Sequence, residues 1–238
     1  MAKTFTIDVF QSQDLSDHHD TNSGDPDLAL DRMKEYIPKA FDNAIGTNHS
    51  ANVTDRGIVA IPDGKQNKGD APRYTGDPCG GSYPVYYETI MDWWEEYYYC
   101  NFVIDSSTNE AEDCALLVTN GNGGGLCHDN YYSIAYRGDE LDQLPSDYSS
   151  LGKNSGFNQM QTQLHEIAHA LLDLTASEEH NSGNTYDRGY YYERWFRTPI
   201  GHGGSGYHNN YCGDWVDEHT TDELMYFDSC SSGNFKHM

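Results

Sequence analysis

Positive charge is scarce in this chain: 14 Lys and Arg residues stand against 38 Asp and Glu residues, for a formal net charge of −24 at pH 7. Because nucleic acids and anionic membrane surfaces are bound mainly through Lys and Arg, this balance argues against both as partners. No apolar run approaches 18 residues, so we expect no membrane insertion. The acidic clusters could hold calcium, although no stretch matches the EF-hand loop.

The chain also lacks a CxxC pair, which argues against zinc-ribbon and thioredoxin-like proteins. Its six cysteines form an even set, and we expect three disulfides in an oxidising compartment rather than six free thiols. Pairing of neighbours is the simplest of the fifteen connectivities: Cys79–Cys100, Cys114–Cys127 and Cys212–Cys230. A secreted protein is therefore predicted, and because the first residues already resemble a strand, this would be its mature form.

Hydrophobic patterning predicts an α+β protein with one domain made of two lobes. Residues 1–174 would form a sheet and a long helix, and residues 175–238 an irregular C-terminal lobe. We expect strands at residues 4–10, 57–62, 101–104, 115–119 and 131–136, and helices near 25–45, 88–99 and 157–174. Residues 121–125 are predicted to be a turn, and the Asn-x-Ser/Thr sites at Asn48 and Asn52 mark an exposed loop.

The most informative motif is His165-Glu-Ile-Ala-His169, which falls within the third predicted helix. Two histidines four positions apart project from the same face of a helix, where neutral imidazoles can bind one zinc ion. Glu166 lies beside this pair and could take a proton from a metal-bound water and pass it to a leaving amine. The motif therefore predicts a zinc-dependent peptide hydrolase.

A catalytic zinc needs a third protein ligand, and several later residues are candidates. His219 is the preferred one, with His180, Asp187 and Glu193 as alternatives. His219 is preferred over the other candidates because of the segment that follows it, Asp222-Glu-Leu-Met225-Tyr226. Together with His165–Leu171, which has the pattern HExxHAL, this segment resembles the metzincin clan of zinc endopeptidases, whose leishmanolysin-type and matrix-metalloprotease members carry a methionine turn beneath the metal.

The resemblance implies a twisted mixed sheet, an active-site helix, and an edge strand that binds a peptide substrate in extended form. Residues 131–136 or 115–119 would provide that edge strand. Met225 would pack under the zinc site, with Tyr226 next to it. The compact family motif is absent, because Leu172 and Thr175 stand where the family has Gly and its third His, so about 50 residues would be inserted before His219.

Two other functions remain open on the residues alone. The segment Thr185-Tyr-Asp187-Arg-Gly-Tyr190 loosely resembles deuterolysin-like proteases, and Glu193 would suit a thermolysin-like zinc site, so an acidic residue could be the third ligand. A non-catalytic secreted binding protein with a structural zinc would need no Glu166. The oligomeric state is not predicted.

Overall fold

The computed structural model describes most of the N-terminal three quarters of the chain and short parts of the remainder. The described residues are 2–42, 49–74, 76–104, 110–172, 184–188, 193–197, 199, 208–209, 215–216, 222–223, 225–227, 231 and 234–236. Among them, no helix is both long and apolar enough to cross a bilayer.

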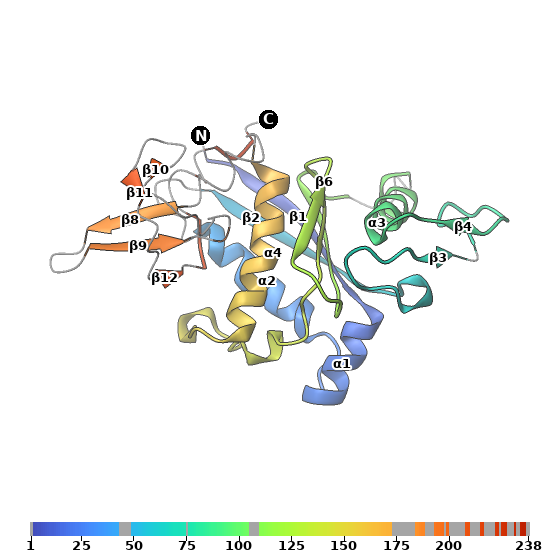
Figure 1. Ribbon diagram of the computed structural model, residues 1–238, viewed down its shortest axis with the longest axis horizontal. Coiled ribbons are helices and arrows are strands. Elements are labelled where there is room, and N and C mark those ends of the chain that lie inside the picture. The colour runs from blue at the N-terminus through green and yellow to red at the C-terminus, as the bar shows by residue number, and fades with distance from the viewer. Residues whose placement is uncertain are drawn as a thin grey trace.

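A five-stranded mixed sheet forms the centre of the molecule (Figure 1). In spatial order its strands are β2 (Ser50–Val59), β1 (Thr4–Ser12), β5 (Cys114–Val118), β7 (Tyr132–Ala135) and β6 (Gly125–His128). Neighbouring strands run parallel except β6, which pairs antiparallel with β7 and forms one edge. With the four α-helices of the described residues packed around it, this sheet is compatible with the predicted α+β class.

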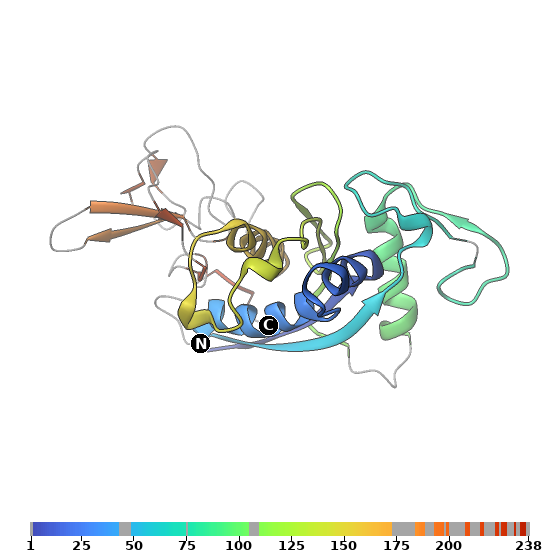
Figure 2. The ribbon, with the colours of Figure 1, turned by 90° about the horizontal axis from the view of Figure 1, so that it is seen from below.

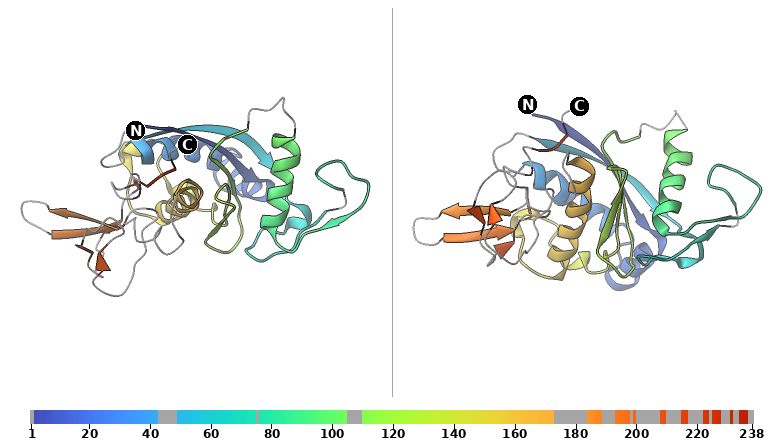
Figure 3. Two further views of the ribbon diagram at one scale, coloured as in Figure 1. Left: turned by 90° about the horizontal axis from the view of Figure 1, so that it is seen from above. Right: turned by 45° about the horizontal axis from the view of Figure 1, so that its top comes forward.

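Each face of the sheet has its own hydrophobic core, because side chains alternate along a strand. In β5, Leu116 points into the core shared with α2 (Leu28–Asp42) and α4 (Ser155–Leu171), whereas Leu117 points into the core shared with α3 (Ile90–Tyr98). We call these the α4 face and the α3 face. Figure 3 shows α4 and α3 on opposite sides of the strands.

The C-terminal segments that the structure describes are short strands and a few core contacts. β8 (Asn184–Arg188), β9 (Glu193–Arg197) and β12 (Asp222–Glu223) form one small sheet, and β10 (His208–Asn209) pairs with β11 (Trp215–Val216). Strands β8 and β9 lie at the opposite end of the molecule from α3 (Figure 2). Met225, Phe227 and Phe235 nevertheless pack into the core of the α4 face, so the two predicted lobes share one core.

Backbone hydrogen bonds fix this C-terminal end onto the α4 face. Phe227 N donates to the carbonyl of Ala40, and Lys236 N donates to the carbonyl of Leu171. The Phe235 ring lies 5.5 Å from that of Phe5 on β1, in an edge-on arrangement.

Several predicted elements differ from the structure. The expected strand at residues 101–104 is instead a π-helical turn, Tyr99–Val103, that continues α3. Its apolar residues belong to a helical face, since the Phe102 ring stacks on that of Tyr98 at 5.1 Å. Helix α1 (Gln13–Ser23) was not predicted, because Leu15 is its only buried aliphatic residue. Asn52 lies exposed on β2 rather than in a loop, and Asn48 lies outside the described residues.

The edge strand was also assigned wrongly. Residues 115–119 form most of β5, which is the central strand. Residues 131–136 include β7, which is paired with β5 on one side and with β6 on the other. The true edge, β6, begins at the end of the glycine run that we expected to be a turn. The smaller elements are β3 (Arg73–Tyr74) paired with β4 (Val85–Tyr86), and the 3-10 turns Pro62–Gly64, Leu141–Gln143 and Tyr148–Ser150.

Candidate functional site

Helix α4 carries the His165–His169 motif, and packing on the sheet fixes its position. Its first turn is capped by Asn154, whose side chain accepts a hydrogen bond from Phe157 N. One side of the helix is buried, with Met160, Leu164 and Ala168 among its fully covered residues. The predicted helix at residues 157–174 is therefore confirmed with slightly earlier limits, and its two motif histidines are only half-buried beside the apolar stripe.

The two imidazoles converge on one point. The Nε2 atoms of His165 and His169 lie 3.0 Å apart. On its other side, His165 places Nδ1 2.8 Å from the carbonyl oxygen of Pro199. A carbonyl can only accept, so Nδ1 carries the proton and Nε2 of His165 presents its lone pair toward His169. This is the outer hydrogen bond that orients metal-binding histidines.

The donor set fits a zinc ion. Two Zn–N bonds of about 2.0–2.1 Å at a tetrahedral angle would place the nitrogens about 3.3 Å apart, close to the 3.0 Å found between the Nε2 atoms. Two neutral nitrogen donors suit zinc better than calcium, which prefers oxygen ligands. The pair could therefore provide two of the three protein ligands that a catalytic zinc requires.

Glu166 lies between α4 and the edge strand β6. The residue is 4% exposed, and its carboxyl group lies directly against Gly125, where a Cβ atom would approach the carboxyl carbon to 2.3 Å. The Glu166 carbonyl accepts a hydrogen bond of 3.0 Å from Ser133 Oγ on β7. Burial raises the pKa of the Tyr136 phenol, and the negative charge of Glu166 raises it further. The carboxylate is thus held close to the first residue of the edge strand.

Gly125, Ser133 and Pro199 were not singled out from the sequence. The glycine run at residues 121–125 contained a signal for Gly125, because a glycine next to a strand often marks a close approach of another group. Ser133 and Pro199 gave no such signal.

The other predicted site residues are placed only in part. His219 and His180 lie outside the described residues. Asp187 lies on β8 and Glu193 on β9, and the backbone alone is described at both. Met225 is 2% exposed and belongs to the same core as the buried side of α4. Tyr226 is half-buried. Burial, and to a smaller extent the electrostatic effect of Tyr226, raises the pKa of the Tyr148 phenol to about 12.

One of the expected disulfides is present and one is not. Cys79 and Cys100 are joined, whereas Cys114 and Cys127 are not disulfide-bonded, so pairing of neighbours is wrong at that position. The two lie on strands separated by β7, and Cys114 Sγ is 3.8 Å from Ser133 Oγ. Burial raises the pKa of the Cys114 thiol well above its usual value. Cys212 and Cys230 lie outside the described residues.

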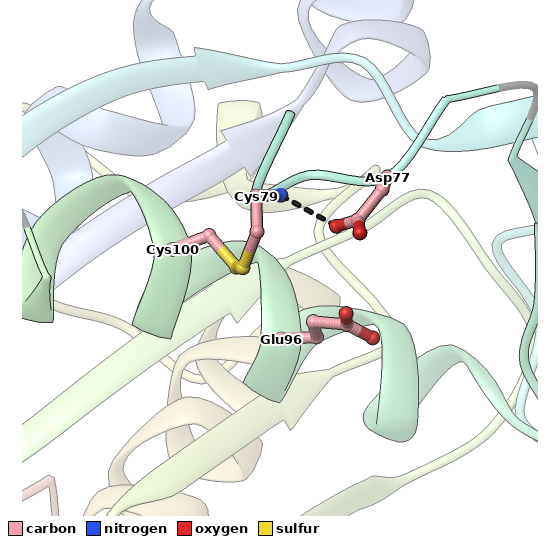
Figure 4. A group of neighbouring side chains, drawn as sticks. All are labelled: Asp77, Cys79, Glu96 and Cys100. Atoms are coloured by element: carbon pink, nitrogen blue, oxygen red, sulfur yellow. Dashed lines mark hydrogen bonds between the residues drawn. A yellow bond between two sulfur atoms is a disulfide. The ribbon is translucent and has the colours of Figure 1, made fainter. Parts of the chain in front are cut away.

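Among the described residues, two groups of three or more potential metal ligands are found, and both lie on the α3 face. The first surrounds the disulfide, with Asp77 and Glu96 beside Cys79 and Cys100 (Figure 4). Asp77 Oδ1 accepts a hydrogen bond of 2.7 Å from Cys79 N. A cysteine binds a metal through its thiolate form. Because both sulfurs of this group are joined in a disulfide, only the carboxylates of Asp77 and Glu96 remain as potential ligands. The second group is Glu95, His128 and Asp129.

Comparison with known protein families and with curated proteins finds no match. A functional assignment therefore rests on the arrangement of the residues themselves.

Proposed function

We propose that this protein is a secreted, zinc-dependent endopeptidase with His165 and His169 as metal ligands and Glu166 as the general base. The observation that carries the proposal is the combination on α4: two Nε2 atoms 3.0 Å apart, with a buried carboxylate on the adjacent residue. A structural zinc site would need a fourth protein ligand and no such carboxylate. The disulfide Cys79–Cys100 is consistent with secretion.

Each residue has a defined task in this proposal. When bound, zinc would lower the pKa of a coordinated water and polarise the scissile carbonyl. Glu166 takes the proton from the attacking water and delivers it to the leaving amine. Pro199 holds the His165 ring in the tautomer that leaves Nε2 available. Burial against Gly125 excludes solvent from one side of the Glu166 carboxylate.

The edge strand β6 offers a place for the substrate. One side of β6 pairs with β7, and within the described part of the chain no strand pairs with its other side. An extended peptide can add to such an edge through main-chain hydrogen bonds. A peptide placed there would lie next to Gly125, where Glu166 meets the strand.

Two features of the described chain are consistent with the metzincin resemblance. It implies a chain order of strand, helix, strands and active-site helix. The elements β1, α2, β2, β5, β6, β7 and α4 follow that order, with α1 added before α2 and α3 added between β2 and β5. It also implies a methionine packed beneath the metal, and Met225 is buried in the core of the α4 face. On this basis His219 is the proposed third ligand, and an acidic ligand at Asp187 or Glu193 is the alternative.

Glu166→Gln tests the proposal most directly. Because Gln keeps the size of the side chain but cannot accept the proton, we expect zinc content and stability to be retained. Hydrolysis of a quenched fluorescent peptide library should fall by about 10²–10⁴-fold. Glu112→Gln, which alters an exposed carboxylate elsewhere, is the control. Hydrolysis at the wild-type rate in Glu166→Gln would exclude this mechanism and favour a binding protein with a structural metal.

The third ligand can be assigned with the same assay. His219→Ala is expected to lose hydrolysis and the zinc bound at His165 and His169, whereas His180→Ala should keep both. If the His219 variant keeps the zinc at that pair, Asp187→Asn and Glu193→Gln become the next tests, and the metzincin assignment fails.

A further inference from the structure

On the α3 face, three side chains with metal-binding atoms meet at the far end of the edge strand. His128 is the last residue of β6, Asp129 follows it, and Glu95 lies on α3. Their ligand atoms all lie within 4.8 Å of one another. The imidazole Nδ1 of His128 contacts Glu95 Oε1.

The chemistry of this group favours a divalent cation. Ligands bound to one zinc ion at about 2.0–2.2 Å lie roughly 3–4 Å apart, so three atoms within 4.8 Å of each other need little movement to share an ion. The carboxylates of Glu95, Asp129 and Asp92 all act electrostatically on the His128 ring. One imidazole therefore faces an excess of negative charge, which a divalent cation would neutralise. A nitrogen donor among the ligands selects zinc over calcium or magnesium.

The geometry points to a second, zinc-type metal site formed by Glu95, His128 and Asp129, separate from the His165–His169 pair. Such a site would join the β6–β7 hairpin to α3. The two sites lie on opposite faces of the sheet, because successive residues of β6 face opposite sides. Gly125 faces α4 and contacts Glu166, whereas His128 faces α3. The metal would thus fix the end of the strand that the proposed substrate adds to. The site itself does not depend on the proposed peptidase activity.

Zinc stoichiometry distinguishes the two sites. Metal-free protein is titrated with zinc alone, by calorimetry and by metal analysis after desalting. We expect two zinc ions per chain in the wild type, one in His128→Ala, one in His165→Ala/His169→Ala, and none in the triple variant. Because the His128 side chain is 55% exposed, its removal should not prevent folding. Asp129→Asn keeps the side-chain shape and tolerates the φ of +50° found there, so its loss of binding would report ligation rather than folding.

The outcomes separate this proposal from the peptidase proposal. If the His165→Ala/His169→Ala chain binds no zinc, or if its zinc binding survives His128→Ala, the second site is refuted. A preference for calcium over zinc would refute the zinc assignment. If the His165→Ala/His169→Ala chain binds as much zinc as the wild type and loses it only with His128→Ala, the second site stands and the α4 site fails. In the His165→Ala/His169→Ala chain, a zinc-dependent rise in the unfolding temperature that His128→Ala abolishes and the control His18→Ala leaves in place provides the second measurement.

Discussion

The two faces of the sheet position histidines in different ways. On the α4 face, His165 and His169 belong to a helix whose opposite side is buried, and Pro199 orients one ring from outside. On the α3 face, His128 extends from a strand end into solvent, where carboxylates surround it. The first arrangement orients two imidazoles in advance, whereas the second places one imidazole among carboxylates. Catalysis needs the first kind of precision, because small displacements of reacting groups reduce rates strongly.

The comparison predicts that the α3 face contributes stability and the α4 face contributes chemistry. Replacing Cys79 and Cys100 together by Ser removes a disulfide that spans 21 residues, which should lower the free energy of unfolding by about 3 kcal/mol. Peptide hydrolysis per folded molecule should stay unchanged. Denaturant unfolding gives the first quantity, and kcat at a temperature well below the transition gives the second.

A lower kcat would contradict this division of roles between the two faces. If kcat falls in the double Ser variant while it remains folded, the α3 face is coupled to the site on α4. Tyr83→Ala, a change of an exposed side chain four residues after Cys79, is the control.

Gly125→Ala should damage the α4 site without touching a proposed ligand. The new Cβ would lie 2.3 Å from the Glu166 carboxyl carbon, so the carboxylate must move. We expect kcat/KM for peptide hydrolysis to fall between about 10- and 100-fold, with zinc content unchanged. Gly124→Ala is the matched control, since its Cβ would meet no atom within 4 Å. Equal activity in the two variants would show that the position of Glu166 against β6 is unimportant.

The sequence predicted those elements whose pattern reflects burial. β1 alternates, α2 and α4 repeat at helical spacing, and all three were located within a few residues. The edge strand was missed because one side of β6 is not paired, and among its residues only Leu126 has the apolar character typical of a strand. The π-helical turn after α3 was misassigned because Phe102 and Val103 favour strands locally, while packing on Tyr98 keeps the backbone helical.

The candidate site was predictable to a similar degree. His165, Glu166 and His169 follow from their spacing, because one helix carries all three. Gly125 and Ser133 reach Glu166 from strands distant in the sequence, so only the folded sheet reveals them. The same holds for His128 and Glu95, whose contact depends on the packing of α3 against β6.

His19 on α1 sharpens the comparison, because it is a buried histidine that belongs to neither proposed metal site. The ring is fully buried. Nε2 donates to the Gly138 carbonyl at 3.0 Å, and Nδ1 has no hydrogen-bond partner in the described part of the structure. Burial lowers the pKa of His19 below its usual 6.5, against the raising effect of the Gly138 hydrogen bond.

This buried histidine should make the fold sensitive to mild acid. Above pH 6.5 the ring is neutral in both states. As the pH falls through 6.5 the unfolded chain binds a proton that the folded chain does not, so the free energy of unfolding decreases until the lower folded pKa is reached. The slope is at most about 1.4 kcal/mol per pH unit. His19→Gln, which can still donate to Gly138, should flatten this slope between roughly pH 7 and 5 in denaturant unfolding series. His18→Gln removes a neighbouring imidazole and is the control. An unchanged slope in His19→Gln would mean that the folded protein accommodates a charged ring at this position.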